Sequence, residues 1–144
     1  MTNEQINLVK ATFEKIEPLS ETVADIFYGR LFELDPNLRH LFKGDMKEQG
    51  RKLMQMIGLA VRGLDRIEEL IPAVQSLGVR HANYGVKEAH YETVAEALLW
   101  TLEKGLGADF TIETKEAWTA VYGLLAQTMK NPSRQTPVKL SISV

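Results

Sequence analysis

The chain has 144 residues, of which 44% are hydrophobic and 25% charged, a composition typical of a single globular domain in water. The formal net charge is −2 and no run of five like charges occurs, so the sequence offers no electrostatic footprint for nucleic acid or an anionic membrane. The absence of cysteine excludes disulfides, cysteine-ligated zinc, iron–sulfur clusters and thioether-linked cofactors.

Helical periodicity dominates the chain. Hydrophobic residues recur at spacings of three and four, and proline, glycine and capping residues separate the segments. No strand, repeat or linker is evident, so we expect an all-α fold. The predicted helices are one that ends at Pro18, one from a Ser20 cap through Leu34, a short one from Asp35-Pro36 to near Phe42, a long one closed by Gly63, one from Ile67 through Leu77 to His81, one over Glu88–Leu106, and one from a cap at Thr111 or Asp109 to about Lys130.

The sequence predicts one domain over residues 1–132 and a flexible C-terminal tail over residues 133–144. Pro132 and Pro137 interrupt the helical pattern in this last part of the chain. No apolar stretch approaches the length of about 18 residues that suggests a membrane-spanning helix. No apolar signal segment follows Met1. We therefore expect a cytoplasmic protein that binds neither membranes nor nucleic acid.

One of the three histidines is placed to bind a metal. His81 follows Leu77 by one helical turn and Val74 by two, so it shares their inward face. A lone histidine is more often a core or helix-end residue than a ligand, so its position alone leaves both interpretations open. His40 is expected at the surface, and His90 opens a helix, where it is expected to be a surface or capping residue.

A series of short segments, taken in order, indicates the kind of fold. No single segment is decisive, but at these spacings the chain resembles a globin, most closely the single-domain bacterial haemoglobins related to the globin half of flavohaemoglobins. The resemblance covers roughly residues 3–130 and implies the globin fold, with about seven to eight helices around a haem pocket. The segments are Phe27-Tyr28, Leu41-Phe42, Gln49 with Arg51-Lys52-Leu53, Arg80-His81 to Tyr84-Gly85-Val86, His90-Tyr91, and Ala117-Trp118 to Tyr122-Gly123.

The resemblance implies a non-covalently held haem b with His81 as the protein ligand of its iron. Tyr28 and Gln49 would face that ligand from the other side and donate hydrogen bonds to dioxygen, which carries partial negative charge when bound, so they are the predicted catalytic residues. From the residues alone, Tyr28 could instead be a core tyrosine bonded to a backbone carbonyl, and Gln49 a solvent-facing helix residue. Because position 49 is not histidine, iron held by two histidines is not expected.

The same resemblance assigns further contacts to the haem. Phe42 would wedge against the porphyrin, and Leu53 would form the apolar wall beside Gln49. Arg80 and Lys52 could pair with the haem propionates, although exposed charged residues are common for other reasons. The remaining candidate contacts, which could equally be ordinary core residues, are Val86, Leu98 and Leu102.

Tyr91 lies ten residues after His81 and corresponds to the tyrosine that reaches the proximal side in flavohaemoglobins. Those proteins also carry a glutamate that hydrogen-bonds to the ligand histidine. Its position here falls near Ser133, beside Pro132, so the carboxylate is missing. Without it, peroxidase-like bond cleavage is in doubt.

These residues suggest a haem protein that binds dioxygen tightly and reversibly, and supports nitric oxide detoxification by conversion to nitrate. Its partners would be dioxygen, nitric oxide and an external electron donor. The alternative is a non-catalytic oxygen carrier, store or sensor, and the sequence does not decide whether the protein is an enzyme. A third possibility, a haem-free globin-like protein, predicts loss of the ligand histidine, so the presence of His81 counts against it.

Overall fold

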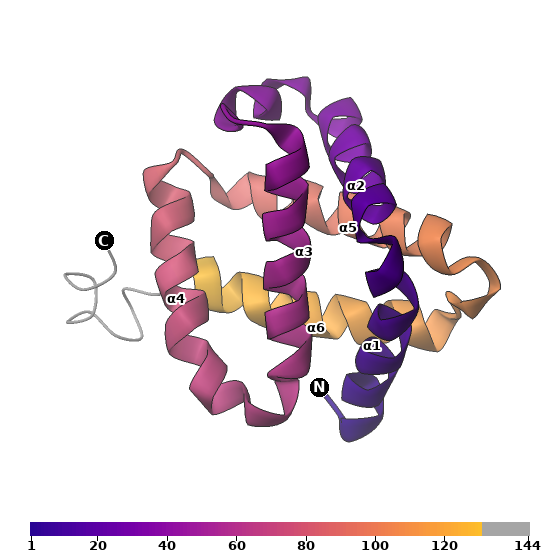
Figure 1. Ribbon diagram of the computed structural model, residues 1–144. Helices are drawn as coiled ribbons and strands as arrows, with labels where there is room; N and C mark the ends of the chain where they lie inside the picture. The colour runs from indigo at the N-terminus through magenta and orange to yellow at the C-terminus, as the bar shows by residue number, and fades with distance from the viewer. Residues whose placement is uncertain (131–144) are drawn as a thin grey trace.

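The computed structural model describes residues 1–130, which form a bundle of helices (Figure 1). No strand occurs within these residues, in agreement with the predicted all-α fold. The predicted tail, residues 133–144, lies outside the described residues. The α-helices are α1 (Asn3–Ile16), α2 (Ser20–Leu34), α3 (Met46–Arg62), α4 (Ile67–Asn83), α5 (Glu88–Leu106) and α6 (Ile112–Lys130), and the 3₁₀ helices are η1 (Glu17–Leu19), η2 (Pro36–Leu41), η3 (Leu64–Arg66) and η4 (Gly107–Asp109).

The expected count of about seven to eight helices is wrong, because residues 1–130 contain six α-helices and four short 3₁₀ helices. The short helix predicted before Phe42 is the 3₁₀ helix η2. It has only 6 residues, and its last backbone hydrogen bond, from the Phe42 N–H to the Arg39 carbonyl, spans three residues rather than four. Such tight helices are common where a connection is too short for regular α-helical turns.

Side chains and glycines mark most helix ends where the sequence predicted them. The Thr111 hydroxyl accepts a hydrogen bond from the Thr114 N–H at the start of α6, at 3.1 Å. Gly107, with a φ of +56°, ends α5 in a conformation that favours glycine. The predicted Ser20 cap is wrong, because the Ser20 hydroxyl donates to the Glu17 carbonyl and α2 follows directly from η1.

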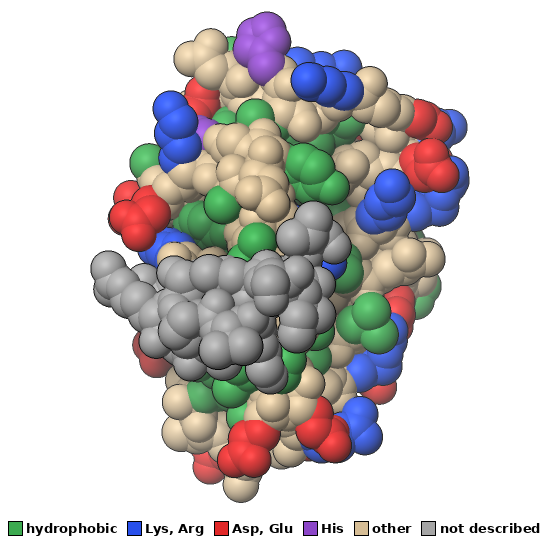
Figure 2. All heavy atoms as spheres, turned by 90° about the vertical axis from the view of Figure 1, so that its left-hand side faces the viewer, with side chains coloured by type: hydrophobic (Ala, Val, Ile, Leu, Met, Phe, Trp, Pro, Cys, Tyr) green, Lys and Arg blue, Asp and Glu red, His purple; other side chains and the backbone are tan. Residues whose placement is uncertain are grey.

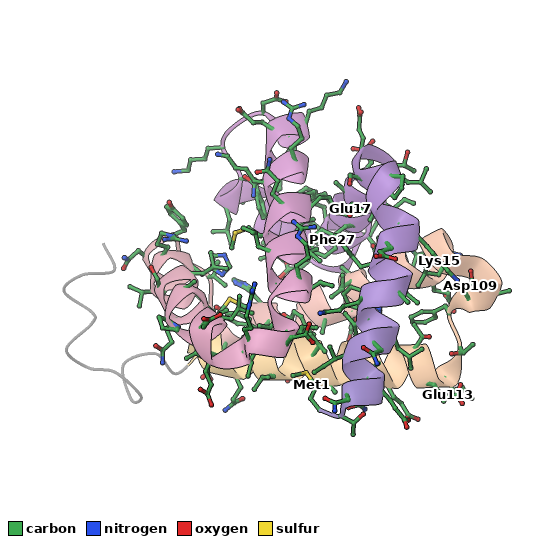
Figure 3. All side chains as sticks on the ribbon, turned by 60° about the horizontal axis from the view of Figure 1, so that its bottom comes forward. Met1, Lys15, Glu17, Phe27, Asp109 and Glu113 are labelled. Atoms are coloured by element: carbon green, nitrogen blue, oxygen red, sulfur yellow. The ribbon has the colours of Figure 1, made fainter. Side chains whose placement is uncertain are left out.

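Asp109, the alternative cap for α6, instead pairs with a lysine of α1. Its carboxylate lies 3.1 Å from the Lys15 Nζ, and the two side chains lie close together in Figure 3. Both side chains are more than half exposed, so this ion pair stabilises the fold only slightly.

The helices pack in pairs that leave α4 with one main neighbour. Helix α2 packs on α5 and α3, and α1 packs on α6. Helix α4 packs mainly on α6, and α5 and α6 lie crosswise behind α3 in Figure 1. None of the helices within residues 1–130 is long and apolar enough to cross a membrane.

Two hydrophobic clusters fill the interior. The first core joins α1, α2, α3, η3, α5 and α6, and includes Phe13, Leu64 and Trp118. The second, the aromatic core, consists of buried Phe27, Tyr28, Leu31, Leu38 and Ala97, and partly buried side chains from η2, α3 and α5 pack against it. Of the residues that the sequence assigned to a ligand pocket, Tyr28 belongs to the aromatic core, and Phe42, Leu53 and Leu98 pack against it.

One glycine allows α3 to approach α2. A Cβ at the buried Gly50 would lie 2.9 Å from the Ala24 Cβ, closer than side-chain carbons pack. The small residues at this crossing bring the first turns of α3 close to the middle of α2. The crossing therefore carries Gln49 toward Tyr28.

A buried polar contact in the first core gives a test of the fold. The indole N–H of Trp118 donates to the Thr12 hydroxyl at 2.9 Å, and both residues are nearly inaccessible to solvent. Replacing Thr12 with Val would keep the shape but leave the indole N–H without its acceptor. We expect Thr12→Val to lower the free energy of unfolding by about 1–3 kcal/mol, measured by denaturant titration.

The matched control is Thr119→Val on the exposed side of α6, where the hydroxyl donates to the Lys115 carbonyl at 2.7 Å. This exchange should change the free energy of unfolding by less than about 0.5 kcal/mol. Equal losses at the two positions would show that the Trp118 bond adds no particular stability.

Candidate functional site

The Tyr28 side chain of α2 is enclosed by aromatic rings. Its own ring centroid lies 5.1 Å from that of Phe27 and 5.3 Å from that of Phe42, both edge-on, and 6.0 Å from that of Phe32 in a stacked arrangement. The residue is only 7% exposed. These contacts hold the phenol in a single apolar setting that α2 and η2 build together.

Gln49 in the first turn of α3 provides the polar partner of Tyr28. Its half-buried side chain lies near enough to the Tyr28 hydroxyl to act on its ionisation. Burial raises the pKa of Tyr28 above its usual value, and the Gln49 amide lowers it in part. The phenol is therefore protonated at neutral pH and able to donate. The structure places the two side chains next to one another, with Tyr28 buried and Gln49 half-buried.

Apolar side chains surround this pair. Phe42, Leu53 and Leu98 are half-buried and pack against the aromatic core from η2, α3 and α5. These are three of the predicted haem contacts. Leu102 does not belong with them, because it is 1% exposed within the first core.

His81 lies near the end of α4 with its backbone held by the following corner. The Val86 and Tyr84 N–H groups both donate to the His81 carbonyl, at 2.9 and 3.1 Å. The imidazole is half-buried and makes no hydrogen bond to any other residue in the described part of the chain. Burial, and to a lesser extent the neighbouring Arg80 charge, lower the pKa of His81. The ring is accordingly neutral at pH 7, the form in which imidazole binds metals.

Tyr91, which the resemblance to flavohaemoglobins assigned to this side of the site, lies beside His81. The two ring centroids are 6.4 Å apart, and Tyr91 is buried at the start of α5. The Tyr122 hydroxyl donates to the Tyr91 carbonyl at 2.7 Å, and the Lys130 Nζ lies 5.7 Å from the Tyr91 ring. Burial raises the pKa of both tyrosines. Helix α6 thus supports this side of the site through Tyr122.

The sequence interpretation missed Tyr122 as a supporting residue, because it reads as one more member of the hydrophobic stripe of α6. Its place in the segment that carries the globin resemblance and its hydroxyl were the available signals, and neither indicates the partner of the hydroxyl. The position near Ser133, where the proximal glutamate of flavohaemoglobins would fall, lies outside the described residues.

The other predicted contacts lie toward the surface. Lys52 and Arg80 are exposed, and the Arg80 guanidinium is 3.3 Å from the Ser76 hydroxyl. Val86 is half-buried at the corner after α4. Figure 2 shows the side of the molecule on which α4 lies, where the described residues present hydrophobic side chains among separate acidic and basic groups.

The other two histidines lie where the sequence predicted them. His40 is exposed in η2. His90 caps α5, because its Nδ1 accepts a hydrogen bond from the Lys87 N–H at 2.9 Å. Among the three, His81 therefore has the half-buried imidazole that makes no hydrogen bond within residues 1–130.

Comparison with known proteins places these features in a family. Residues 25–129 match the model of the globin family. The flavohemoprotein of Vibrio cholerae is 32% identical over 130 residues, which make up 88% of this chain and 33% of that protein. The flavohemoprotein of Bacillus subtilis is 30% identical over 129 residues, or 88% of this chain and 32% of that protein. The chain thus spans about a third of the length of these curated relatives.

Solved structures agree with the sequence matches. An engineered carbene transferase, whose parent protein from Rhodothermus marinus is regarded as a nitric oxide dioxygenase, superposes with a TM-score of 0.83 at 27% identity, over 98% of this chain and 99% of that one. A bacterial globin from Campylobacter jejuni superposes with a TM-score of 0.79 at 26% identity, over 93% of this chain and 97% of that one. The family match, the relatives and the helical arrangement agree, and the chain belongs to the globin family.

Proposed function

We propose that this globin binds haem b without a covalent link and that His81 is the protein ligand of the iron. The support is the donor set within the described residues. The His81 imidazole is neutral and half-buried, and it makes no hydrogen bond to any other described side chain. His40 is exposed, and the Nδ1 of His90 is engaged in capping α5. A haem needs one such nitrogen together with an apolar lining.

The lining on the opposite side would come from the aromatic core. Phe42, Leu53 and Leu98 present partly buried apolar surface there, and Val86 adds to it at the corner after His81. Tyr91 would steady the ligand ring from α5. The exposed side chains of Lys52 and Arg80 would pair with the haem propionates.

The observation that carries the function is the placement of the Gln49 amide beside the Tyr28 hydroxyl in apolar surroundings. When bound, the iron porphyrin supplies a reducible centre that binds dioxygen and shifts negative charge onto it. The Tyr28 hydroxyl and the Gln49 amide can both donate to that charge, and Leu53 and Phe42 keep water away from it. Two donors in a water-poor pocket favour slow release of dioxygen.

Tight and reversible binding of dioxygen would support detoxification of nitric oxide. Nitric oxide, dioxygen and one electron combine to give nitrate, so an external electron donor has to supply one electron for each turnover. The likeness to a protein regarded as a nitric oxide dioxygenase favours this activity over a carrier, store or sensor. A cytoplasmic location would give access to such a donor.

Haem binding should depend on His81 alone among the histidines. His81→Ala removes the nitrogen that would bind the iron, so we expect protein that loses haem readily and lacks the spectrum of the wild type. His40→Ala and His90→Ala are the matched controls and should keep that spectrum. Absorption spectra of the three reduced, haem-loaded variants decide the assignment, and a wild-type spectrum for His81→Ala would refute it.

The Tyr28 and Gln49 donors should slow the release of dioxygen. A hydrogen bond to a charged group is worth about 1.5–3 kcal/mol, so Tyr28→Phe should speed release about tenfold to a hundredfold. Gln49→Leu should act in the same direction. Release of carbon monoxide, which carries little charge on its outer atom, should change much less. Because both donors address one ligand, the effects of the two substitutions should not simply add in the double variant.

Stopped-flow measurement of both gases tests this, with Tyr84→Phe as the control because the Tyr84 side chain is 69% exposed. Equal effects of Tyr28→Phe on both gases would mean that Tyr28 acts by its size and not by donating a hydrogen bond.

A measurement of nitrate formation distinguishes the nitric oxide dioxygenase from the oxygen carrier or store. Haem-loaded protein supplied with nitric oxide, dioxygen and a general reductant should form nitrate continuously, and Tyr28→Phe should form it more slowly. Nitrate production no faster than with the same concentration of free haem would instead favour the carrier or store.

A further inference from the structure

Gly78 lies in α4 one helical turn before His81, and its backbone touches the backbone of α6. A Cβ at this buried position would lie 2.2 Å from the Met129 carbonyl oxygen, 2.6 Å from its Cα and 2.8 Å from its carbonyl carbon. These distances are far shorter than any real Cβ contact. Because the obstacle is main chain, no change of rotamer can relieve it. Helix α4 can take its place only because residue 78 has no side chain.

This contact differs from those of other helical glycines. A Cβ at Gly29 or Gly123 would meet nothing within 4 Å, and a Cβ at Gly58 would meet only the end of the flexible Arg62 side chain. Gly78 is therefore a point of direct approach between two helix backbones, whereas Gly123, in α6 itself, is open.

The position of the contact matters for His81. Residues three apart lie on neighbouring positions of one helix face, with a rise of about 4.5 Å along the axis. Helix α4 has α6 as its main packing partner, and Gly78 is a point at which the two backbones meet directly. The corner after α4 holds the His81 carbonyl through the Val86 and Tyr84 N–H groups, so the residue has little freedom of its own.

We propose that Gly78 is a positioning residue for His81: its bare contact with Met129 sets how closely α4 approaches α6, and thereby the depth at which the imidazole lies. The inference rests on the proposed function, in which that imidazole is the haem ligand. A side chain at position 78 would push α4 outward and draw the ring with it.

Gly78→Ala in the haem-loaded protein tests this. We expect the iron–histidine stretching band in the resonance Raman spectrum of the reduced protein to move from its wild-type frequency. Haem transfer to an excess of an acceptor apoglobin should become about five- to a hundredfold faster, the range expected for overpacking a close contact. Gly123→Ala should leave both measurements unchanged. Met129→Ala should also leave them unchanged, because the contact involves only the Met129 main chain.

A second experiment separates the iron-binding imidazole from helix α4. In His81→Gly protein supplied with free imidazole, the ligand is no longer tied to α4. Adding Gly78→Ala to this background should therefore produce no shift of the band. If Gly78→Ala alone cannot hold haem, recovery of haem by the double variant with imidazole supports the proposal. Failure of that double variant to load would overturn it, because Gly78 would then be needed for the fold as a whole.

The outcomes for the two proposals are distinct. A wild-type protein that shows no iron–histidine band would contradict the proposed function and the positioning role together. A normal wild-type band that Gly78→Ala does not move, or a shift that persists with detached imidazole, would overturn the positioning role alone.

Discussion

The approach of the Gln49 amide to the Tyr28 phenol is the constraint on which this side of the site depends. The phenol is buried among aromatic and aliphatic side chains, where a polar group without a partner costs about 1–3 kcal/mol, and the half-buried amide of Gln49 lies beside it. Their meeting requires that α3 approach α2 closely, which Gly50 and Ala24 permit. It also requires that Phe42 close the aromatic core from η2. The polar pair and the small-residue crossing are thus parts of one arrangement.

The two sides of the site are held by different helices. The Tyr28 side depends on the packing of α2 against α3 and α5, and the His81 side on the packing of α4 against α6. The hydrogen bond from Tyr122 to the Tyr91 carbonyl is a link between them, since it ties α6 to the start of α5. Substitutions near Tyr28 and Gln49 can therefore change the hydrogen-bond donors on that side without moving the His81 imidazole. In a protein that binds a gas, this separation allows the affinity to be adjusted from one side alone.

Residue patterns predicted much of this arrangement, and where they failed the reason is physical. Periodicity, glycine and capping residues located the helices, since each acts within one or two turns of chain. The 3₁₀ form of η2 and the hydroxyl bond of Ser20 escaped prediction because both depend on how a short connection is closed. The Tyr122 bond and the Gly78 contact join residues of separate helices through backbone atoms, which carry no sequence signal. The ligand roles of His81, Tyr28 and Gln49 stay predictions.

The dependence of α4 on α6 has a consequence for the order in which the protein is made. Synthesis runs from the N-terminus, so α4 leaves the ribosome before α5 and well before α6, the helix that supports it. Helix α2 can pack on α3 and then on α5 before α6 has been made, so the Tyr28 half of the site can assemble while the chain is still growing. The His81 half has to wait for the last described helix. A nascent chain would accordingly complete this part of the fold in two stages, with the His81 side second.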